Sequence, residues 1–281
     1  MTSRTIAQSL DWATQVLQGG DSPKTDAKVL LAHVIDKSST YLFTWPESIV
    51  SSDDFARFET LVRRRSLGEP VAYIIGYRDF WTLRLEVSTA TLIPRPETEL
   101  LVELAIDKIS DGDKVCDLGT GTGAIALAIA AECESSHVLG IDRIPEAVAL
   151  ATRNAKANAI TNAEFIQSNW FDAVGPQTFN VIVSNPPYVE PDSPYLTQGD
   201  VRFEPLSALT AEKAGLADIE FISQRASVHL KVGGWLLFEH GFEQGEAVAR
   251  ILLNNGYECI ETFKDLNGLD RITVGKRKAC E

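Results

Sequence analysis

The sequence lacks an apolar run long enough to cross a membrane. Its longest apolar stretches, such as residues 71–75 and 124–131, are far shorter than the roughly 20 residues that a membrane helix needs. The N-terminal segment is interrupted by Asp11 and Gln15 and contains no signal-peptide core. We therefore expect a cytoplasmic protein without a membrane partner.

Cysteine and histidine are scarce, with four residues of each in 281. The cysteines do not have metal-ligand spacing, and the histidines are scattered along the chain without a cluster of acidic residues or cysteines beside them. An intracellular setting also disfavours disulfides. The composition therefore predicts neither a metal site nor a disulfide framework.

Basic residues are fewer than acidic residues. The chain has 26 Lys and Arg against 39 Asp and Glu, which gives a formal net charge of −13. Such a balance favours solubility and argues against broad binding to nucleic acid. Two basic runs, at residues 63–65 and 276–278, are interpreted as a solvated helix face and a solvated chain end. We therefore expect no direct nucleic-acid partner.

The first 70 residues have the spacing of a small helical domain. Apolar residues recur at helical intervals near residues 5–17, after Ser22-Pro23, and after Ser52, which we interpret as a helix cap. Residues 71–96 follow as a hairpin connector, with a predicted strand at 71–75 and an alternating segment from Trp81.

From residue 97 to residue 281, strand and helix patterns alternate. This order predicts an α/β domain with a mostly parallel sheet covered on both faces. Strands are expected at 114–118, 138–142, 164–167, 179–184 and 235–239, and helices near 97–110, 124–132, 146–158, 215–230 and 243–254. Two final strands, 258–263 and 271–275, should form an antiparallel hairpin at the edge. Ligands of such sheets bind at the carboxyl ends of the strands.

A glycine-rich loop follows the first strand of this domain. Gly119, Thr120, Gly121, Thr122 and Gly123 lie between a strand and a helix, where the backbone must turn sharply and approach a ligand closely. The same spacing, read with Ala124, also fits a dinucleotide loop. The loop therefore predicts a nucleoside-containing cofactor without distinguishing adenosylmethionine from NAD.

Two further residues fit a nucleoside. Asp142 ends the second strand and could accept hydrogen bonds from both ribose hydroxyls, or could instead cap the helix that begins near Pro145. Trp170 follows the third strand, where its ring could pack on an adenine or belong to the core.

The fourth strand ends at the motif that favours methyl transfer over hydride transfer. Asn185, Pro186, Pro187 and Tyr188 offer acceptors and few donors, because proline has no N–H group. The Asn185 side-chain oxygen and the Pro186 carbonyl could hold both hydrogens of an NH2 group and aim its lone pair at a methyl donor. Tyr188 could stack on the planar acceptor. A plain turn is the alternative interpretation.

With these residues in view, the chain resembles a known family. The motif from Asn185 to Tyr188 is similar to the signature of enzymes that methylate exocyclic amino groups of bases or protein glutamines. Further segments resemble the release factor glutamine methyltransferase (HemK-type) family, in the order of that family: residues 73–76, 80–81, 92–99, 117–123, 204–205 with 208–209, and 264–268.

The resemblance implies a class I methyltransferase (Rossmann-like) fold, S-adenosyl-L-methionine as cofactor and S-adenosyl-L-homocysteine as product. It implies methylation of the side-chain amide of the glutamine in the Gly-Gly-Gln motif of class 1 peptide chain release factors. The helical domain, residues 1–70, would then recognise the release factor, and residues 97–281 would form the catalytic domain.

The resemblance also assigns roles to residues. Gly119, Thr120, Gly121, Thr122, Gly123, Asp142 and Trp170 would bind the cofactor, with Asn185 beside the methyl group. Asn185, Pro186, Pro187 and Tyr188 would form the glutamine pocket, and catalysis would rest on Asn185, Pro186 and Tyr188. Arg95 and Glu97 belong to a family motif but have no role that the sequence reveals.

Two alternative functions compete with methylation of a release factor. A DNA or RNA exocyclic-amino methyltransferase would flip a base into the same pocket, but it should show a basic face and an inserted recognition region. A noncatalytic cofactor-binding protein would not need an intact motif from Asn185 to Tyr188.

Overall fold

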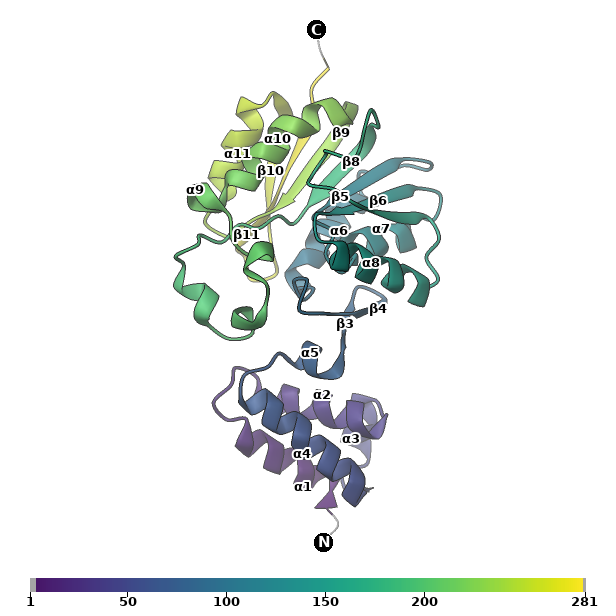
Figure 1. The fold of residues 1–281 in the computed structure, drawn as a ribbon, viewed down its shortest axis with the longest axis vertical. Helices are drawn as coiled ribbons and strands as arrows, with labels where there is room; N and C mark the ends of the chain where they lie inside the picture. The colour runs from purple at the N-terminus through teal and green to yellow at the C-terminus, as the bar shows by residue number, and fades with distance from the viewer. Residues whose placement is uncertain (1–3, 280–281) are drawn as a thin grey trace. The chain divides into compact units, whose positions relative to one another are not determined.

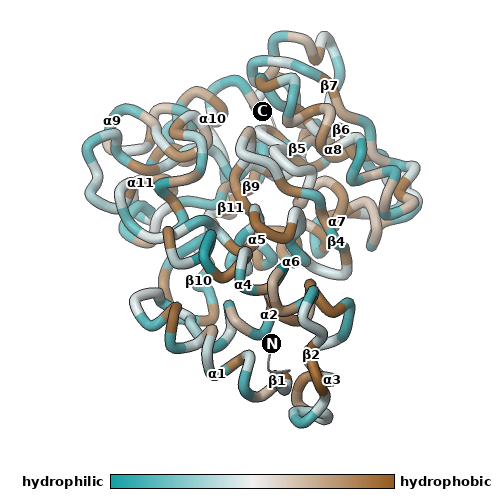
Figure 2. Tube along the Cα trace, turned by 60° about the horizontal axis from the view of Figure 1, so that its bottom comes forward, coloured by the Kyte–Doolittle hydropathy of each residue, from teal (hydrophilic) through white to brown (hydrophobic). Residues whose placement is uncertain are grey.

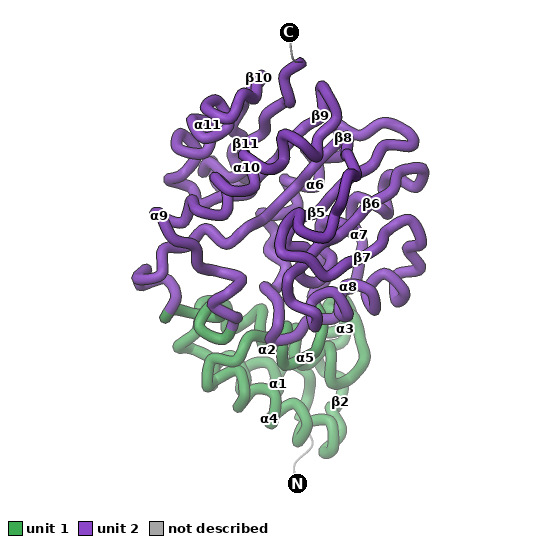
Figure 3. Tube along the Cα trace, turned by 45° about the horizontal axis from the view of Figure 1, so that its top comes forward, with its two compact units in different colours: residues 1–77, 197–203 green, residues 78–196, 204–281 purple. Residues whose placement is uncertain are grey.

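The computed structural model describes residues 4–279. The chain forms two compact units, shown in different colours in Figure 3. The first, which we call the helical unit, comprises residues 1–77 together with residues 197–203. The second, which we call the sheet unit, comprises residues 78–196 and 204–281. A short segment from the second half of the sequence therefore belongs to the helical unit.

The helical unit is built from short helices (Figure 1), and their apolar side chains form one core. Its elements are β1 (Arg4–Thr5), α1 (Ile6–Val16), α2 (Pro23–Ile35), α3 (Ser39–Thr44), β2 (Ile49–Val50), α4 (Ser52–Ser66) and α5 (Val71–Ile75). Thr5 begins α1 with a capping box, because its side chain accepts from the Gln8 N–H and the Gln8 side chain accepts from the Thr5 N–H. Phe58, Leu30 and Leu31 are fully buried at the centre.

The structure confirms the three predicted helices and corrects two details of this region. The cap of α4 is Ser51, whose hydroxyl accepts from the Asp54 N–H, rather than Ser52. The predicted strand at 71–75 is wrong, because these residues form the helix α5. Pro70 precedes this helix and Gly76 ends it in the left-handed conformation, with φ of 86°. A run of five apolar residues has no periodicity that could separate a strand from a buried helical turn.

Arg65 joins segment 197–203 to the helices of its own unit. The side chain of Arg65 is 11% exposed and donates hydrogen bonds of 2.6 Å to both Asp26 and Asp200. Arg202 donates from the same segment to the carbonyl of Leu67 at 3.3 Å. Because Arg65 is shielded from water, these ion pairs are screened less than surface pairs. They hold the returning segment against α2 and the end of α4.

The sheet unit contains a seven-stranded sheet in the order β10-β11-β9-β8-β5-β6-β7, in addition to the hairpin β3–β4. Its strands are β3 (Tyr77–Phe80), β4 (Leu83–Glu86), β5 (Lys114–Leu118), β6 (His137–Asp142), β7 (Ala163–Gln167), β8 (Phe179–Ser184), β9 (Leu230–Glu239), β10 (Tyr257–Lys264) and β11 (Asp270–Arg277). Strands β5 to β9 pair in parallel, and β11 pairs antiparallel with both β9 and β10. The structure thus confirms the parallel sheet and the terminal antiparallel hairpin.

Helices cover both faces of this sheet, as Figure 1 shows. The α-helices are α6 (Glu99–Ile106), α7 (Ala124–Glu132), α8 (Pro145–Ala157), α9 (Glu212–Gly215), α10 (Ala217–His229) and α11 (Gly245–Asn254). Short 3-10 helices are η1 (Pro96–Thr98) and η4 (Leu206–Ala208). Of two others, η3 (Val201–Phe203) lies in the helical unit and η2 (Pro194–Thr197) ends at its first returning residue. Side chains of α6 and α7 join one apolar core, and side chains of α10 and α11 join the other. Because both faces are buried, the central strands carry apolar stretches, such as Leu236, Leu237 and Phe238 in β9, and the trace is brown near the β9 label in Figure 2.

No helix within residues 4–279 is both long enough and apolar enough to span a membrane.

Candidate active site

The glycine-rich loop lies at the carboxyl end of β5. The N–H groups of Gly119 and Thr120 both donate to the Ile141 carbonyl at 2.8 Å, which ties the loop to β6. Gly121 has a φ of 55°, a conformation that favours glycine. Gly123 precedes α7, and a Cβ atom there would lie 3.1 Å from Ala151 and from Leu127. Gly123 therefore permits close packing of the helix, whereas the other loop residues face a pocket.

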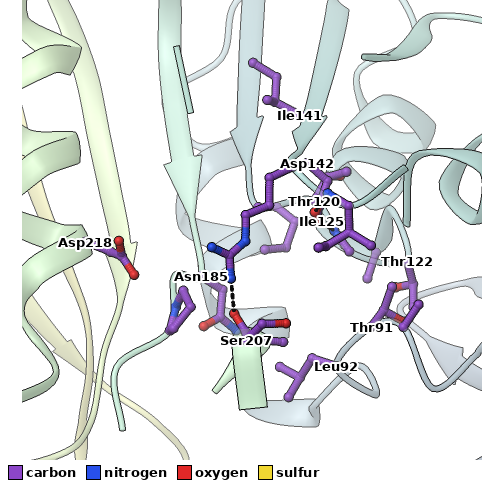
Figure 4. Close-up of a pocket in the computed structure, with 18 of the residues that line it drawn as sticks. Thr91, Leu92, Thr120, Thr122, Ile125, Ile141, Asp142, Asn185, Ser207 and Asp218 are labelled. Atoms are coloured by element: carbon purple, nitrogen blue, oxygen red, sulfur yellow. Dashed lines mark hydrogen bonds between the residues drawn. The ribbon is translucent and has the colours of Figure 1, made fainter. Parts of the chain in front are cut away.

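A pocket of about 250 Å³ opens beside this loop (Figure 4). It brings together eight of the residues that the sequence predicts for the site: Gly119, Thr120, Gly121, Thr122, Asp142, Trp170, Asn185 and Pro187. Three predicted residues, Gly123, Pro186 and Tyr188, are outside its lining. The pocket thus joins the carboxyl ends of β5, β6 and β8, where an open α/β sheet binds its ligands.

Asp142 accepts hydrogen bonds from two backbone N–H groups. It does not cap α8, whose N-cap is Ile144 without a side-chain cap hydrogen bond, and its binding of the ribose stays a prediction. Its Oδ2 atom accepts from the Gly121 N–H at 2.9 Å, and its Oδ1 atom accepts from the Ile144 N–H at 2.9 Å. Burial raises the pKa of Asp142, and these backbone hydrogen bonds oppose the rise. Since each carboxylate oxygen has further lone pairs, Asp142 can hold the loop, precede α8 and still accept from a ligand in the pocket.

Trp170 lies between the pocket and the core, and its packing on an adenine stays a prediction. It lines the pocket and packs against the core that contains Phe171 and Ile182. Its ring lies 3.6 Å from the position of a Cβ atom on Gly119. The absence of a side chain at Gly119 therefore lets the indole lie against the loop backbone.

Asp117 supports the loop from below, a role that the sequence did not reveal. It is fully buried, and its Oδ2 atom accepts from the Thr120 hydroxyl at 2.6 Å and from the Ala126 N–H at 3.2 Å. Its Oδ1 atom is buried without a hydrogen-bond partner among the described residues. Burial raises the pKa of Asp117 from 3.8 to about 7, with a further contribution from the charge of Asp142. The ionised carboxylate is therefore costly to the folded state.

This cost predicts a pH dependence that an Asp117→Asn variant should lack. Since the folded protein binds the proton more tightly than the unfolded chain, the wild-type free energy of unfolding should fall as the pH rises from about 4 to about 7, and this contribution should be constant above that range. The difference from the variant should reach on the order of 4 kcal/mol. Urea denaturation across this pH range measures it. Parallel curves for the two proteins would contradict the prediction.

Asn185 directly follows β8, and its amide is oriented by Thr98. The Asn185 Nδ2 atom donates to the Thr98 Oγ1 atom at 3.3 Å. Thr98 is 4% exposed and ends η1. Because the amide nitrogen is engaged on this side, the Asn185 oxygen remains as the acceptor for a ligand in the pocket.

Tyr188 is bound at both its side chain and its backbone. Its hydroxyl donates to the Glu239 Oε1 atom at 3.3 Å, and its carbonyl accepts from the Gln244 side chain at 3.1 Å. Burial and the negative charge of Glu239 raise the pKa of the Tyr188 hydroxyl, so this group stays neutral. The tyrosine is therefore fixed against the end of β9.

Arg95 forms an ion pair that the sequence could not predict. Its Nη2 atom donates to Glu204 at 2.6 Å, and the Ile93 N–H donates to the other oxygen of the same carboxylate at 3.2 Å. The Glu204 side chain is 0% exposed, and Arg95 lines the pocket. Nearby, Arg143 donates to the Ser207 carbonyl at 3.1 Å, the contact dashed in Figure 4. These contacts hold residues 204–207 at the rim of the pocket.

Metal-binding groups are not gathered in the part of the chain that the structure describes, where no cluster of three or more His, Cys, Asp or Glu side chains has a suitable arrangement.

Comparison with known proteins shows which class of protein has this fold. Residues 96–198 match the family described as Methyltransferase small domain. The solved structure of a methyltransferase from Pyrococcus furiosus is 18% identical, with a TM-score of 0.56 over 77% of this chain and 98% of that one. The chain thus has a class I methyltransferase (Rossmann-like) fold, and it is a methyltransferase.

The helical unit and the full-length relatives narrow the class to a family. Residues 8–76 match the family described as PrmC N-terminal domain. The release factor glutamine methyltransferase of Vibrio cholerae is 54% identical over 98% of both chains, and that of Aliivibrio fischeri is 52% identical over 92% of both chains. The chain belongs to the release factor glutamine methyltransferase family.

Proposed function

We propose that the protein transfers a methyl group to the side-chain amide nitrogen of the glutamine in the Gly-Gly-Gln motif of class 1 release factors. The observation that most directly supports this proposal is the position of Asn185. Its amide oxygen is left as an acceptor in the pocket that the glycine-rich loop lines, because its nitrogen donates to Thr98. An acceptor beside a cofactor loop suits a substrate that presents an NH2 group.

The residues around the pocket fit S-adenosyl-L-methionine. Gly119 and Gly121 bring the loop backbone to the pocket wall, Asp142 offers carboxylate oxygens for the ribose hydroxyls, and Trp170 offers a ring face for the adenine. When bound, this cofactor supplies an electrophilic methyl group. The uncharged glycine and threonine side chains of the loop leave charge recognition to Asp142 and to the backbone.

The glutamine amide would be held by acceptors. The Asn185 Oδ1 atom, in the pocket lining, and the carbonyl of the next residue, Pro186, would each accept one of the two amide hydrogens, which would turn the nitrogen lone pair out of conjugation with its carbonyl. No base has to act first, since the nitrogen becomes acidic once it is alkylated and then loses a proton to water. Catalysis therefore depends mainly on orientation of the amide.

We further propose that the helical unit docks the release factor. Apolar side chains near α3 are exposed although the unit has a complete core: Phe43 is 88% exposed and Trp45 is 57% exposed. Exposed aromatic residues are frequent anchors of protein interfaces. Contacts made here would supply affinity without touching the glutamine.

The test of this function is transfer of a labelled methyl group to purified substrates. We expect labelling of a class 1 release factor and none of a release factor whose motif glutamine is replaced by asparagine. Duplex DNA and ribosomal RNA serve as the competing substrates. Labelling of either nucleic acid with an unlabelled release factor would reject the proposal in favour of base methylation.

Docking predicts a selective defect when the exposed aromatics are removed. The double substitution Phe43→Ser and Trp45→Ser should raise the KM for release factor by about thirtyfold or more, because truncation of a hot-spot aromatic costs about 2 kcal/mol or more. The kcat and the affinity for cofactor should be retained. Leu253→Ser, at a 64% exposed apolar position on the sheet unit, is the matched control. An equal effect of both changes would remove the docking role.

A further inference from the structure

A buried polar chain lies behind the motif from Asn185 to Tyr188. It begins at Asn185, whose Nδ2 atom donates to the Thr98 hydroxyl at 3.3 Å. It continues to Glu239, whose pKa is raised by burial and lowered by the adjacent Thr98 hydroxyl. Glu239 also accepts from the Tyr188 hydroxyl at 3.3 Å. One buried carboxyl group therefore lies beside Thr98 and binds Tyr188, the last residue of the motif.

The direction of this chain is fixed by chemistry. Glu239 already accepts from Tyr188, and an acceptor oxygen beside Thr98 favours the rotamer in which the Thr98 hydroxyl hydrogen is directed toward Glu239. The oxygen of that hydroxyl then accepts from Asn185, which requires the NH2 side of the Asn185 amide to point toward Thr98. The oxygen side consequently points to the pocket. With the amide turned over, a donor would face the NH2 group of the substrate.

Glu239 has a buried carboxyl group, which costs free energy in the folded state. It ends β9 and is 1% exposed, and its Oε2 atom has no hydrogen-bond partner in the described part of the chain. Burying an acidic group costs free energy unless partners compensate. The positive charge of Arg271, which is itself paired with Asp265, compensates part of that cost. The nearby charge of Glu97 opposes it.

We propose that Thr98 and Glu239 are positioning residues that set the orientation of the Asn185 amide, so that its oxygen receives the amide hydrogen of the substrate. This inference rests on the proposed function, and it gives a purpose to the segment around Pro96–Thr98. Neither residue touches the substrate. Each acts through Asn185 or Tyr188, which distinguishes this role from that of the pocket residues.

A pair of variants at Thr98 tests the inference. Thr98→Val preserves shape but lacks the hydroxyl, and Thr98→Ser preserves the hydroxyl. We expect Thr98→Val to lower kcat by about tenfold to a hundredfold, since small misplacements of an orienting group can reduce rates that much. The KM for release factor and the cofactor affinity should stay near wild-type values. Thr98→Ser should restore most of the rate.

The effect should also depend on Asn185. In an Asn185→Ala background, Thr98→Val should cause little further loss, because the group that Thr98 orients is already absent. Glu239→Gln, which keeps the shape but not the charge, should lower kcat in the same way if Thr98→Val does not fold. Wild-type kcat in Thr98→Val, an equal loss in Thr98→Ser, or additive losses in the double variant would each overturn the inference.

A measurement without substrate separates this inference from the proposed function. In labelled wild-type protein and in Thr98→Ser, nuclear magnetic resonance should show one Asn185 side-chain amide proton protected from exchange, and Thr98→Val should lose that protection. If the wild-type enzyme transfers no methyl group to release factor, the proposed function is wrong. The spectrum still shows whether Thr98 orients the Asn185 amide. Two unprotected Asn185 side-chain amide protons in the wild-type protein would overturn the inference.

Discussion

Replacing Asn185 with alanine is expected to reduce kcat for release factor methylation by at least about a hundredfold, in line with the loss of one preorganised polar group at a reacting centre. The affinity for S-adenosyl-L-methionine should fall little, because the cofactor would be held mainly by the glycine-rich loop and Asp142. The reason for this separation is that the Asn185 oxygen acts on the substrate amide as it reacts. Single-turnover kinetics and calorimetry measure the two quantities separately.

The matched control for this change is Asn169→Ala. Asn169 lines the same pocket, but it is exposed and its amide donates only a long hydrogen bond, of 3.4 Å, to Asp172. We expect this variant to keep a kcat near that of the wild type. If both asparagine variants lose activity equally, or if Asn185→Ala keeps the wild-type rate, Asn185 does not orient the substrate.

The second large effect is expected for the cofactor when Asp142 is replaced by alanine. Loss of a hydrogen bond to a charged group costs about 1.5–3 kcal/mol, which corresponds to an affinity weakened by roughly tenfold to a hundredfold. The same change also frees Gly121, whose N–H donates to Asp142. Calorimetric titration with S-adenosyl-L-homocysteine would measure the sum of both effects.

Deoxy analogues of the product distinguish ribose binding from support of the loop. If Asp142 accepts from the ribose, removal of a ribose hydroxyl should weaken binding to the wild-type protein but have little effect on the Asp142→Ala variant. If Asp142 only holds Gly121, the two losses should add. The second outcome would leave Asp142 as a loop support and reject its assignment to the ribose.

The parts of the fold that were predictable are those in which one local pattern determines the structure. Continuous apolar strands such as Phe179–Ser184 alternate with amphipathic helices, and the residues predicted there agree closely with β8 and its neighbours. The strand predicted at Val71–Ile75 was wrong because no local pattern determines the structure there. Its five residues show neither the period of a helix nor that of a strand, and the deciding features were the conformations of Pro70 and Gly76.

For the site, the sequence indicates which residues lie at the carboxyl edge of the sheet. It does not indicate which buried side chains form hydrogen bonds with them. The glycine-rich loop and Asn185 follow strands, so parallel topology alone brings them together. The pairing of Arg95 with Glu204 joins positions 109 residues apart, and that of Tyr188 with Glu239 joins positions 51 apart. A buried carboxylate gives no local periodicity, and its partner depends on the packing of the whole unit.

The return of residues 197–203 to the helical unit has a consequence for the order of events during synthesis. The apolar core of that unit is contributed by residues between Ile6 and Ile75, so it can form as soon as this part of the chain is made. Asp200 is added 135 positions after Arg65, which at a typical rate of translation is roughly ten seconds later. Until then Arg65 has Asp26 alone as its acidic partner, so the first unit to fold stays incomplete until residues 197–203 have been made.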